Sequence, residues 1–264
     1  MSKPRIYQTE AIIIKKIKLG EADRILSLYT PLLGKIRAVA KGVRRPRSKM
    51  AGHLELLTHS LVSLARGRNL DTVTGSQTID SFVPLKTDLQ LGAYALYITE
   101  LTEQFTAENN MESSFLFQLL LGTMHNLCQA GDKELVLRYF EMRLLDEVGY
   151  RPQLHQCVSC GTMLQPVINS FCSRAGGVLC PNCCHKYPLT LPLSVNIQKV
   201  LRLLQNGGYN TVSRLKMGPK LSQQVEGVIR DYLRSLLERE VKSVVWLDML
   251  REQIQLNEVT VGIM

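Results

Sequence analysis

Four cysteines in two closely spaced pairs are the residues of this chain whose type and spacing could bind a metal ion. Cys157 and Cys160 form the first pair, Cys180 and Cys183 form the second, and 19 residues lie between the pairs. Each CxxC turn can direct two thiolates at one ion, and two such turns complete the tetrahedral coordination of a structural Zn²⁺. Because four protein ligands leave no position for water, the spacing predicts one structural zinc ion and no catalytic one.

Two residues beside the second pair could replace a ligand. Cys184 follows Cys183 directly and His185 comes next, and both are residue types that bind zinc. The segment between the pairs contains a glycine pair and is expected to form a small hairpin. The ion would then hold together an insertion at about residues 153–188, which is too short for a hydrophobic core of its own.

A second stretch suited to binding is residues 34–50, GKIRAVAKGVRRPRSKM, in a region that has no Asp or Glu between Asp23 and Glu55. Its first half alternates apolar and basic residues as a strand does, whereas Pro46 and the polar second half predict a mobile loop. A basic strand face that leads into a basic loop is a surface for a polyanion such as DNA. The cations expected to neutralise phosphates are Lys35, Arg37, Lys41, Arg44, Arg45, Arg47 and Lys49.

The net charge of the chain is concentrated in its N-terminal third. The 264 residues carry a formal net charge of +9. Residues 1–80 hold 15 Lys and Arg against 6 Asp and Glu, and the remaining residues hold 17 of each kind. Solubility alone would not segregate charge in this way, so the distribution favours a polyanionic partner. A site of this kind predicts little sequence preference and a steep dependence on salt.

The pattern of elements changes near residue 84, from an alternation with period two to the 3.6-residue period of helices. Before that point, turn signals separate five short extended segments, at residues 10–16, 25–30, 35–41, 56–65 and 69–82. The sequence therefore predicts an α+β protein. Residues 1–82 would form a five-stranded OB-fold β-barrel, and residues 83–264 an α-helical domain that carries the four-cysteine zinc-finger insertion.

One predicted helix, residues 133–148, offers two interpretations. Its apolar stripe is most simply part of the helical core, with Arg138, Glu141 and Arg143 exposed on the other side. Alternatively, it borders a groove for a partner peptide, with Arg138 or Arg143 as the anchor for a carboxylate. Near the C-terminus, Trp246 is expected to anchor the last segment on the helical core.

Signatures of catalysis and of membrane insertion are absent from the sequence. There is no GxxxxGK[ST] phosphate loop, no GxGxxG after a strand and no HExxH spacing. No apolar run approaches the roughly 18 residues of a membrane span, and the first residues lack the apolar stretch of a signal peptide. Seven cysteines, an odd number, suit a reducing cytosol better than a disulfide framework. The sequence thus predicts a non-enzymatic cytoplasmic protein without a membrane partner.

Three ordered blocks of the sequence resemble the bacterial DNA repair protein RecO, a family of recombination mediators. The blocks are GEADRILSLYTPLLGKIRAVAKGVRRPRSKMAGHLELLT (residues 20–58), RYFEMRLLDEVGYRPQLHQCVSCG (residues 138–161) and DYLRSLLEREVKSVVWL (residues 231–247). The resemblance extends over nearly the whole chain and implies the same OB-fold, helical domain and zinc finger. Some members lack the cysteines, and the intact pairs place this chain with those that bind metal.

The resemblance also implies a function and partners. RecO-like proteins bind single- and double-stranded DNA and anneal complementary strands without ATP. With RecR they help to load RecA onto DNA coated by single-stranded DNA-binding protein, so that RecA is an indirect partner. Some contact the acidic C-terminal tail of the coating protein through the helical domain, which makes Arg138 and Arg143 the candidate anchors. A nucleoid-associated protein of the bacterial cytoplasm is expected.

Two other classes of function remain open from the residues. A zinc-stabilised DNA-processing enzyme could use the cysteine insertion to hold its substrate. An RNA-binding accessory protein is the other alternative, because an electrostatic surface need not distinguish RNA from DNA.

Overall fold

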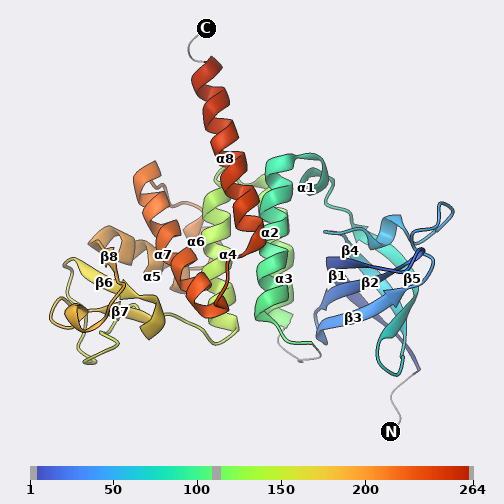
Figure 1. Ribbon diagram of the computed structural model, residues 1–264, viewed down its shortest axis with the longest axis horizontal. Helices are drawn as coiled ribbons and strands as arrows, with labels where there is room; N and C mark the ends of the chain where they lie inside the picture. Colours follow the sequence, from blue (N-terminus) through green and yellow to red (C-terminus); the bar gives the residue numbers. More distant parts are fainter. Residues whose placement is uncertain (1–4, 109–113, 262–264) are drawn as a thin grey trace. The chain divides into compact units, whose positions relative to one another are not determined.

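The computed structural model describes residues 5–108 and 114–261, with side chains as far as residue 253 (Figure 1). The chain divides into two compact units. One consists of Met1–Gln129 together with Val241–Met264, and the other of Ala130–Glu240. This division differs from the predicted one, because the first three helices and the last helix belong with the barrel. Independent folding of residues 1–82 stays a prediction.

The first unit contains the predicted five-stranded barrel. Its strands close in the order β1-β2-β3-β5-β4, with β3 and β5 parallel and the other neighbouring pairs antiparallel. This arrangement, a three-stranded meander followed by a crossover, is the one expected for an OB-fold. The bounds are β1 Ile6–Leu19, β2 Asp23–Thr30, β3 Gly34–Ala40, β4 His59–Ala65 and β5 Asp71–Asp80.

Strand β1 closes the barrel because it is long enough to pair with two partners. Its first half pairs with β4 and its second half with β2, and the register shifts between Ile13 and Lys15. Alternate residues point inward, so the barrel interior is filled by aliphatic side chains. This interior includes Ala11, Ile13, Leu26, Leu28, Ile36, Ala38, Ala40, Val62, Leu64 and Val73.

The described part of the first unit also contains four α-helices: α1 Val83–Thr87, α2 Leu89–Phe105, α3 Ser114–Gln129 and α8 Lys242–Val261. Helix α2 packs against α1, α3, α8 and strand β1. The Glu100 carboxylate of α2 accepts hydrogen bonds from the backbone N–H groups of Lys242 and Ser243, at 3.0 and 2.8 Å. These bonds cap the N-terminus of α8 and hold it against α2.

The prediction that Trp246 is a buried anchor is wrong. Its side chain is 64% exposed, whereas the adjacent Leu247 is 1% exposed. Consecutive residues on a helix point about 100° apart, so only one of these two can face inward. The buried face of α8 contains Ser243 and Leu247. The large aromatic side chain of Trp246 was therefore not a guide to which face of the helix is buried.

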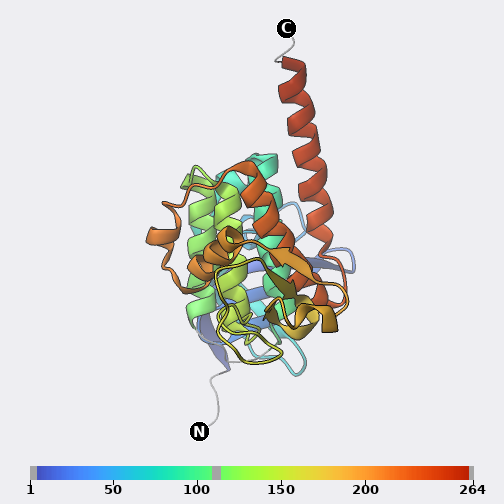
Figure 2. The ribbon, with the colours of Figure 1, turned by 90° about the vertical axis from the view of Figure 1, so that its left-hand side faces the viewer.

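The second unit combines a helical core with a three-stranded sheet, seen in yellow and gold in Figure 2. Helix α4 packs against α5, α6 and α7, and the sheet has the order β7-β6-β8. The helices are α4 Lys133–Glu147, α5 Val195–Asn206, α6 Tyr209–Val212 and α7 Pro219–Leu237. The strands are β6 Asn169–Cys172, β7 Gly177–Leu179 and β8 Leu191–Leu193. None of the helices in the described part of the chain is long and apolar enough to cross a membrane.

The prediction that Arg138 and Glu141 are exposed on α4 is also wrong. Their side chains are 1% and 0% exposed and form an ion pair of 2.8 Å. Arg138 also lies 3.4 Å from Glu226 of α7, which in turn pairs with Arg230 at 2.7 Å. Helix α4 is covered by several helices of its unit, so its charged side is buried too, and the charges are paired inside the core.

Breaking this buried network should destabilise the protein strongly. We expect Glu141→Ala to lower the free energy of unfolding by roughly 3–5 kcal/mol, because Arg138 keeps its buried charge and loses its nearer carboxylate. The double variant Arg138→Met/Glu141→Leu should lose less, since it removes both charges. Denaturant unfolding measures both changes, and equal losses for the single and double variants would contradict the prediction.

Candidate functional site

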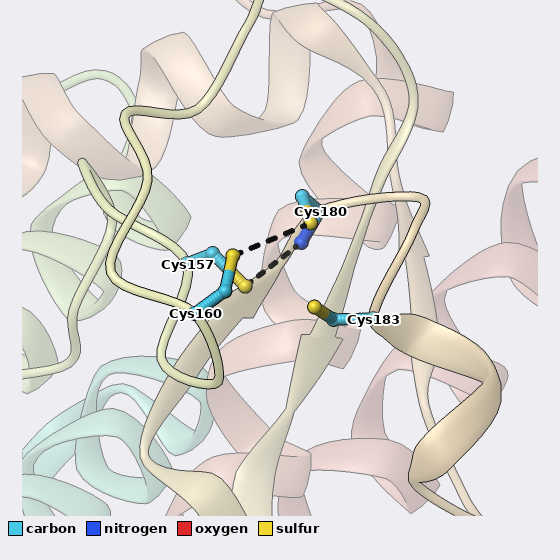
Figure 3. Close-up of side chains that lie close together, drawn as sticks. All are labelled: Cys157, Cys160, Cys180 and Cys183. Carbon is cyan, nitrogen blue, oxygen red and sulfur yellow. Dashed lines mark hydrogen bonds between the residues drawn. The ribbon is translucent and has the colours of Figure 1, made fainter.

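The four predicted cysteines come together in the second unit, at the ends of two loops that face each other (Figure 3). Their sulfur atoms all lie within 4.8 Å of one another, and the sulfurs of Cys160 and Cys180 are 3.9 Å apart. A tetrahedron of Zn–S bonds of about 2.3 Å has sulfurs about 3.8 Å apart. The cluster therefore has the donor atoms and nearly the spacing that one zinc ion requires.

Short turns direct each pair of thiols toward the centre. The Gly161 N–H donates to the Cys157 carbonyl at 2.8 Å, and Gly161 has a φ of +74°, which favours glycine. In the second turn, the Cys183 N–H donates to the Cys180 carbonyl at 3.0 Å. The Cys180 N–H also lies 3.4 Å from the Cys157 sulfur and joins the two turns.

The predicted hairpin between the cysteine pairs is present as β6 and β7, which pair antiparallel. Its second strand, β7, begins at Gly177, where an added Cβ would lie 2.5 Å from the Gln153 carbonyl oxygen. Only glycine fits this close approach of the two backbones. Strand β7 then leads directly into Cys180, so the hairpin sets the distance between the two halves of the cluster.

Neither alternative ligand belongs to the cluster in the described chain. The Cys184 thiol donates a hydrogen bond to the Pro181 carbonyl at 3.2 Å, and His185 lies in the 3-10 turn that follows. Cys172, between the pairs, is buried in β6 at 1% exposure. The set Cys157, Cys160, Cys180 and Cys183 is thus the one that the fold brings together.

The neighbouring groups shift the pKa values of two of these thiols in opposite directions. Hydrogen bonds from Thr162, foremost that of its hydroxyl at 3.1 Å, lower the pKa of Cys160 to about 6. Ser159 lowers the pKa of Cys183, but Cys180 and burial outweigh it and raise that pKa to about 11. Four adjacent thiolates repel one another, and a divalent cation removes that repulsion.

The basic loop, defined here as residues 41–49, presents its cations on the surface of the barrel. Lys41, Arg44, Arg45, Arg47 and Lys49 are all exposed. The base of the loop is anchored beside the turn between β1 and β2: the Arg44 N–H donates to the Ala22 carbonyl at 2.9 Å, and the Gly42 N–H to Asp23 at 2.7 Å. The backbone at the base of the loop is thus held in place, while its cationic side chains are exposed.

Comparisons with known proteins cover most of the chain. A family model described as "Recombination protein O N terminal" matches residues 1–82, and one described as "Recombination protein O C terminal" matches residues 86–244. The chain is 47% identical over 251 residues to "DNA repair protein RecO" of Dehalococcoides mccartyi strain CBDB1, covering 95% of this chain and 98% of the relative. The chain belongs to the RecO family of DNA repair proteins.

Relatives with the same name occur in other bacteria. The protein of Roseiflexus sp. strain RS-1 is 42% identical over 253 residues, which is 96% of this chain and 89% of the relative. That of Symbiobacterium thermophilum is 33% identical over 249 residues, 93% of this chain and 98% of the relative. The resemblance found in the three sequence blocks is confirmed.

Two cations expected to contact phosphates in this RecO-family chain face carboxylates of its own first unit. The Lys35 side chain is 8% exposed, and its Nζ donates to the Glu103 carbonyl at 2.6 Å and lies 3.8 Å from the Glu103 carboxylate. Arg37 pairs with Glu108 at 3.4 Å. Burial lowers the pKa of Lys35, although Glu103 and Glu108 oppose that effect.

The alternation predicted for residues 35–41 is nevertheless correct for the inward face of β3, where Ile36, Ala38 and Ala40 are buried. The C-terminal end of α2 covers the outer side chain of Lys35. That contact joins residues 68 positions apart, so the local pattern could not show it. In this arrangement the basic loop, and not Lys35, is available to a phosphate.

Sequence reasoning did not single out Arg66, an exposed cation in the loop between β4 and β5. The local sequence ARGRN indicates a turn, through its glycine, and nothing more. In the structure Arg66 lies over the ring of Tyr7, 59 residues earlier, with its guanidinium carbon 4.6 Å from the ring centroid. No spacing rule connects these two positions.

Neutralising Glu108 should strengthen DNA binding. We expect Glu108→Gln to raise the affinity for single-stranded DNA about threefold at low salt, because it releases Arg37 from a surface ion pair of modest strength. The gain should disappear when Arg37→Gln is also present. Fluorescence anisotropy with a labelled oligonucleotide measures these affinities. Glu252→Gln, an equal charge change at an exposed residue of α8, is the control, and an equal gain there would contradict the prediction.

Proposed function

We propose that this RecO-family protein is a non-enzymatic recombination mediator that binds single- and double-stranded DNA and anneals complementary strands. The exposed cations of the basic loop are the observation that carries the proposal. Five of them project from a short loop whose base is anchored on the barrel. Together with RecR, the protein would help to load RecA onto DNA coated by single-stranded DNA-binding protein.

The loop would act on DNA through its phosphates. If about four cations engage a single strand, the logarithm of the affinity should fall with the logarithm of salt at a slope of roughly −3. Two DNA strands whose phosphates are neutralised by these cations repel each other less. They can therefore pair without ATP. Lys35 and Arg37 would join the loop only when Glu103 and Glu108 move aside.

The cysteine cluster would hold one structural Zn²⁺ through Cys157, Cys160, Cys180 and Cys183. Support comes from four sulfurs within 4.8 Å of one another and from turns that aim them at a common centre. The ion would supply no chemistry to a reaction, since four thiolates fill its coordination. Its role would be to fix the two loops and the hairpin between them.

Arg143 is the remaining candidate anchor for the acidic C-terminal tail of single-stranded DNA-binding protein. Its side chain is 20% exposed, lies 3.4 Å from Asp146 and donates to the Gln205 carbonyl at 3.0 Å. Arg138 is not proposed for this role, because it is buried in its ion-pair network. With these partners, the protein would act at the nucleoid of the bacterial cytoplasm.

An annealing assay tests the proposal. Two complementary strands are coated with single-stranded DNA-binding protein and mixed with this protein, without nucleotide, over a series of salt concentrations. Acceleration that fades as salt increases supports the mediator, whereas tight DNA binding without acceleration rejects it. A matched RNA competitor that displaces DNA more effectively would indicate the RNA-binding alternative, because the basic loop offers charge and little base recognition.

A further inference from the structure

The loop between β4 and β5 has a defined shape. Arg66 is exposed, and it is followed by Gly67, where an added Cβ would lie 1.9 Å from the Leu70 carbonyl oxygen. Only glycine permits this tight turn. The Asp71 carboxylate accepts a hydrogen bond from the Gly67 N–H at 3.0 Å. The arginine is therefore presented by an ordered turn and not by a flexible chain.

The guanidinium of Arg66 rests on an aromatic ring that is itself held in place. Its central carbon lies 4.6 Å from the centroid of the Tyr7 ring, within the range of a cation–π contact. The Tyr7 hydroxyl donates to Asp71, the same carboxylate that holds the loop. Burial, and then this hydrogen bond, raise the pKa of Tyr7, so the hydroxyl remains a donor.

This arrangement lies beside the strand that leads into the basic loop. Asp71 begins β5 and pairs with Ala38 of β3, which ends two residues later at Ala40. In OB-fold barrels, oligonucleotides lie across the face of the second and third strands, next to the loop that joins the fourth and fifth. A DNA strand bound to the cations of residues 41–49 would thus pass Arg66, at the edge of the same β-sheet.

We infer that Arg66, seated on Tyr7, stacks against an unpaired base of single-stranded nucleic acid. The guanidinium is planar and stacks on aromatic faces, and Tyr7 preorganises one side of it. An unpaired base can offer its face to such a platform, whereas the bases of a duplex stack on one another. The inference rests on the proposed function and deepens it: the basic loop serves both forms of DNA, and Arg66 favours single strands.

Replacing Arg66 with Lys keeps the charge and removes the planar group. We expect Arg66→Lys to lower the affinity for a single-stranded oligonucleotide about tenfold at constant salt. A loss of this size corresponds to one stacking contact between a base and the protein. The affinities for a duplex and for an oligonucleotide with abasic sites should change less than about twofold. Arg68→Lys, an exposed arginine in the same loop, is the matched control and should change all three affinities by less than about twofold.

The wild-type protein gives an independent test, because it should bind the abasic oligonucleotide about tenfold more weakly than the intact one. Equal binding of the two, or an equal loss of single-strand and duplex affinity in Arg66→Lys, overturns the inference. Lys41→Glu/Arg44→Glu separates this failure from that of the proposed function. If this variant loses DNA binding while Arg66→Lys does not, only the stacking role fails; if it binds normally, the proposed function itself fails.

Discussion

Replacing Cys180 with Ser should reduce the zinc content of the purified protein from about one ion per chain to nearly none. Three thiolates and a hydroxyl form a much weaker tetrahedral site than four thiolates, and metal binding stabilises the folded form of such insertions directly. Structural zinc sites in small domains contribute about 10–16 kcal/mol of apparent binding free energy, so loss of the ion should destabilise the second unit by several kcal/mol.

Elemental analysis and hydrogen exchange measure the two parts of this prediction. Exchange should accelerate most in the loops that carry the cysteines and in the hairpin between them. Cys184→Ser is the matched control, because the Cys184 thiol donates a hydrogen bond to the Pro181 carbonyl and lies outside the cluster. If Cys180→Ser retained a full zinc ion, or if Cys184→Ser lost it, the assigned ligand set would be incorrect.

Reversing two charges of the basic loop should weaken the binding of single- and double-stranded DNA by about two orders of magnitude at low salt. Lys41→Glu/Arg44→Glu removes two phosphate contacts and adds two repulsive charges. Each lost contact with a single strand should reduce the magnitude of the salt slope by about 0.7, from roughly −3 to roughly −1.5. Titrations at several salt concentrations give both quantities.

Arg214→Glu/Lys216→Glu is the control for this double variant. It makes the same change in net charge with two exposed residues of the second unit. We expect it to reduce DNA affinity only slightly, because it removes no cation of the basic loop and salt screens its general effect on the charge of the protein. An equal loss in both variants would show that the protein responds to total charge, and it would reject the basic loop as the binding site. The unfolding midpoint of each variant shows whether it is folded.

The features that depend on short stretches of chain could be predicted from the sequence. The CxxC spacing determines two tight turns, and it identified the four cysteines that the fold brings together. The alternation of apolar residues determines which side of a strand faces inward, and it located the strands of the barrel to within a few residues. Both rest on local backbone geometry, which neighbouring residues control.

Contacts between distant parts of the chain decided which charged side chains are accessible. Lys35 belongs to a basic strand, but the end of α2 buries it. Arg138 resembles a surface residue, but α4 is surrounded by helices and the arginine pairs with Glu141 and Glu226 inside the core. The contact of Arg66 with the Tyr7 ring likewise joins distant parts of the chain, a loop and strand β1. The side chains present in a segment follow from its sequence, whereas their exposure depends on which other segment packs against them, and that is a property of the folded chain.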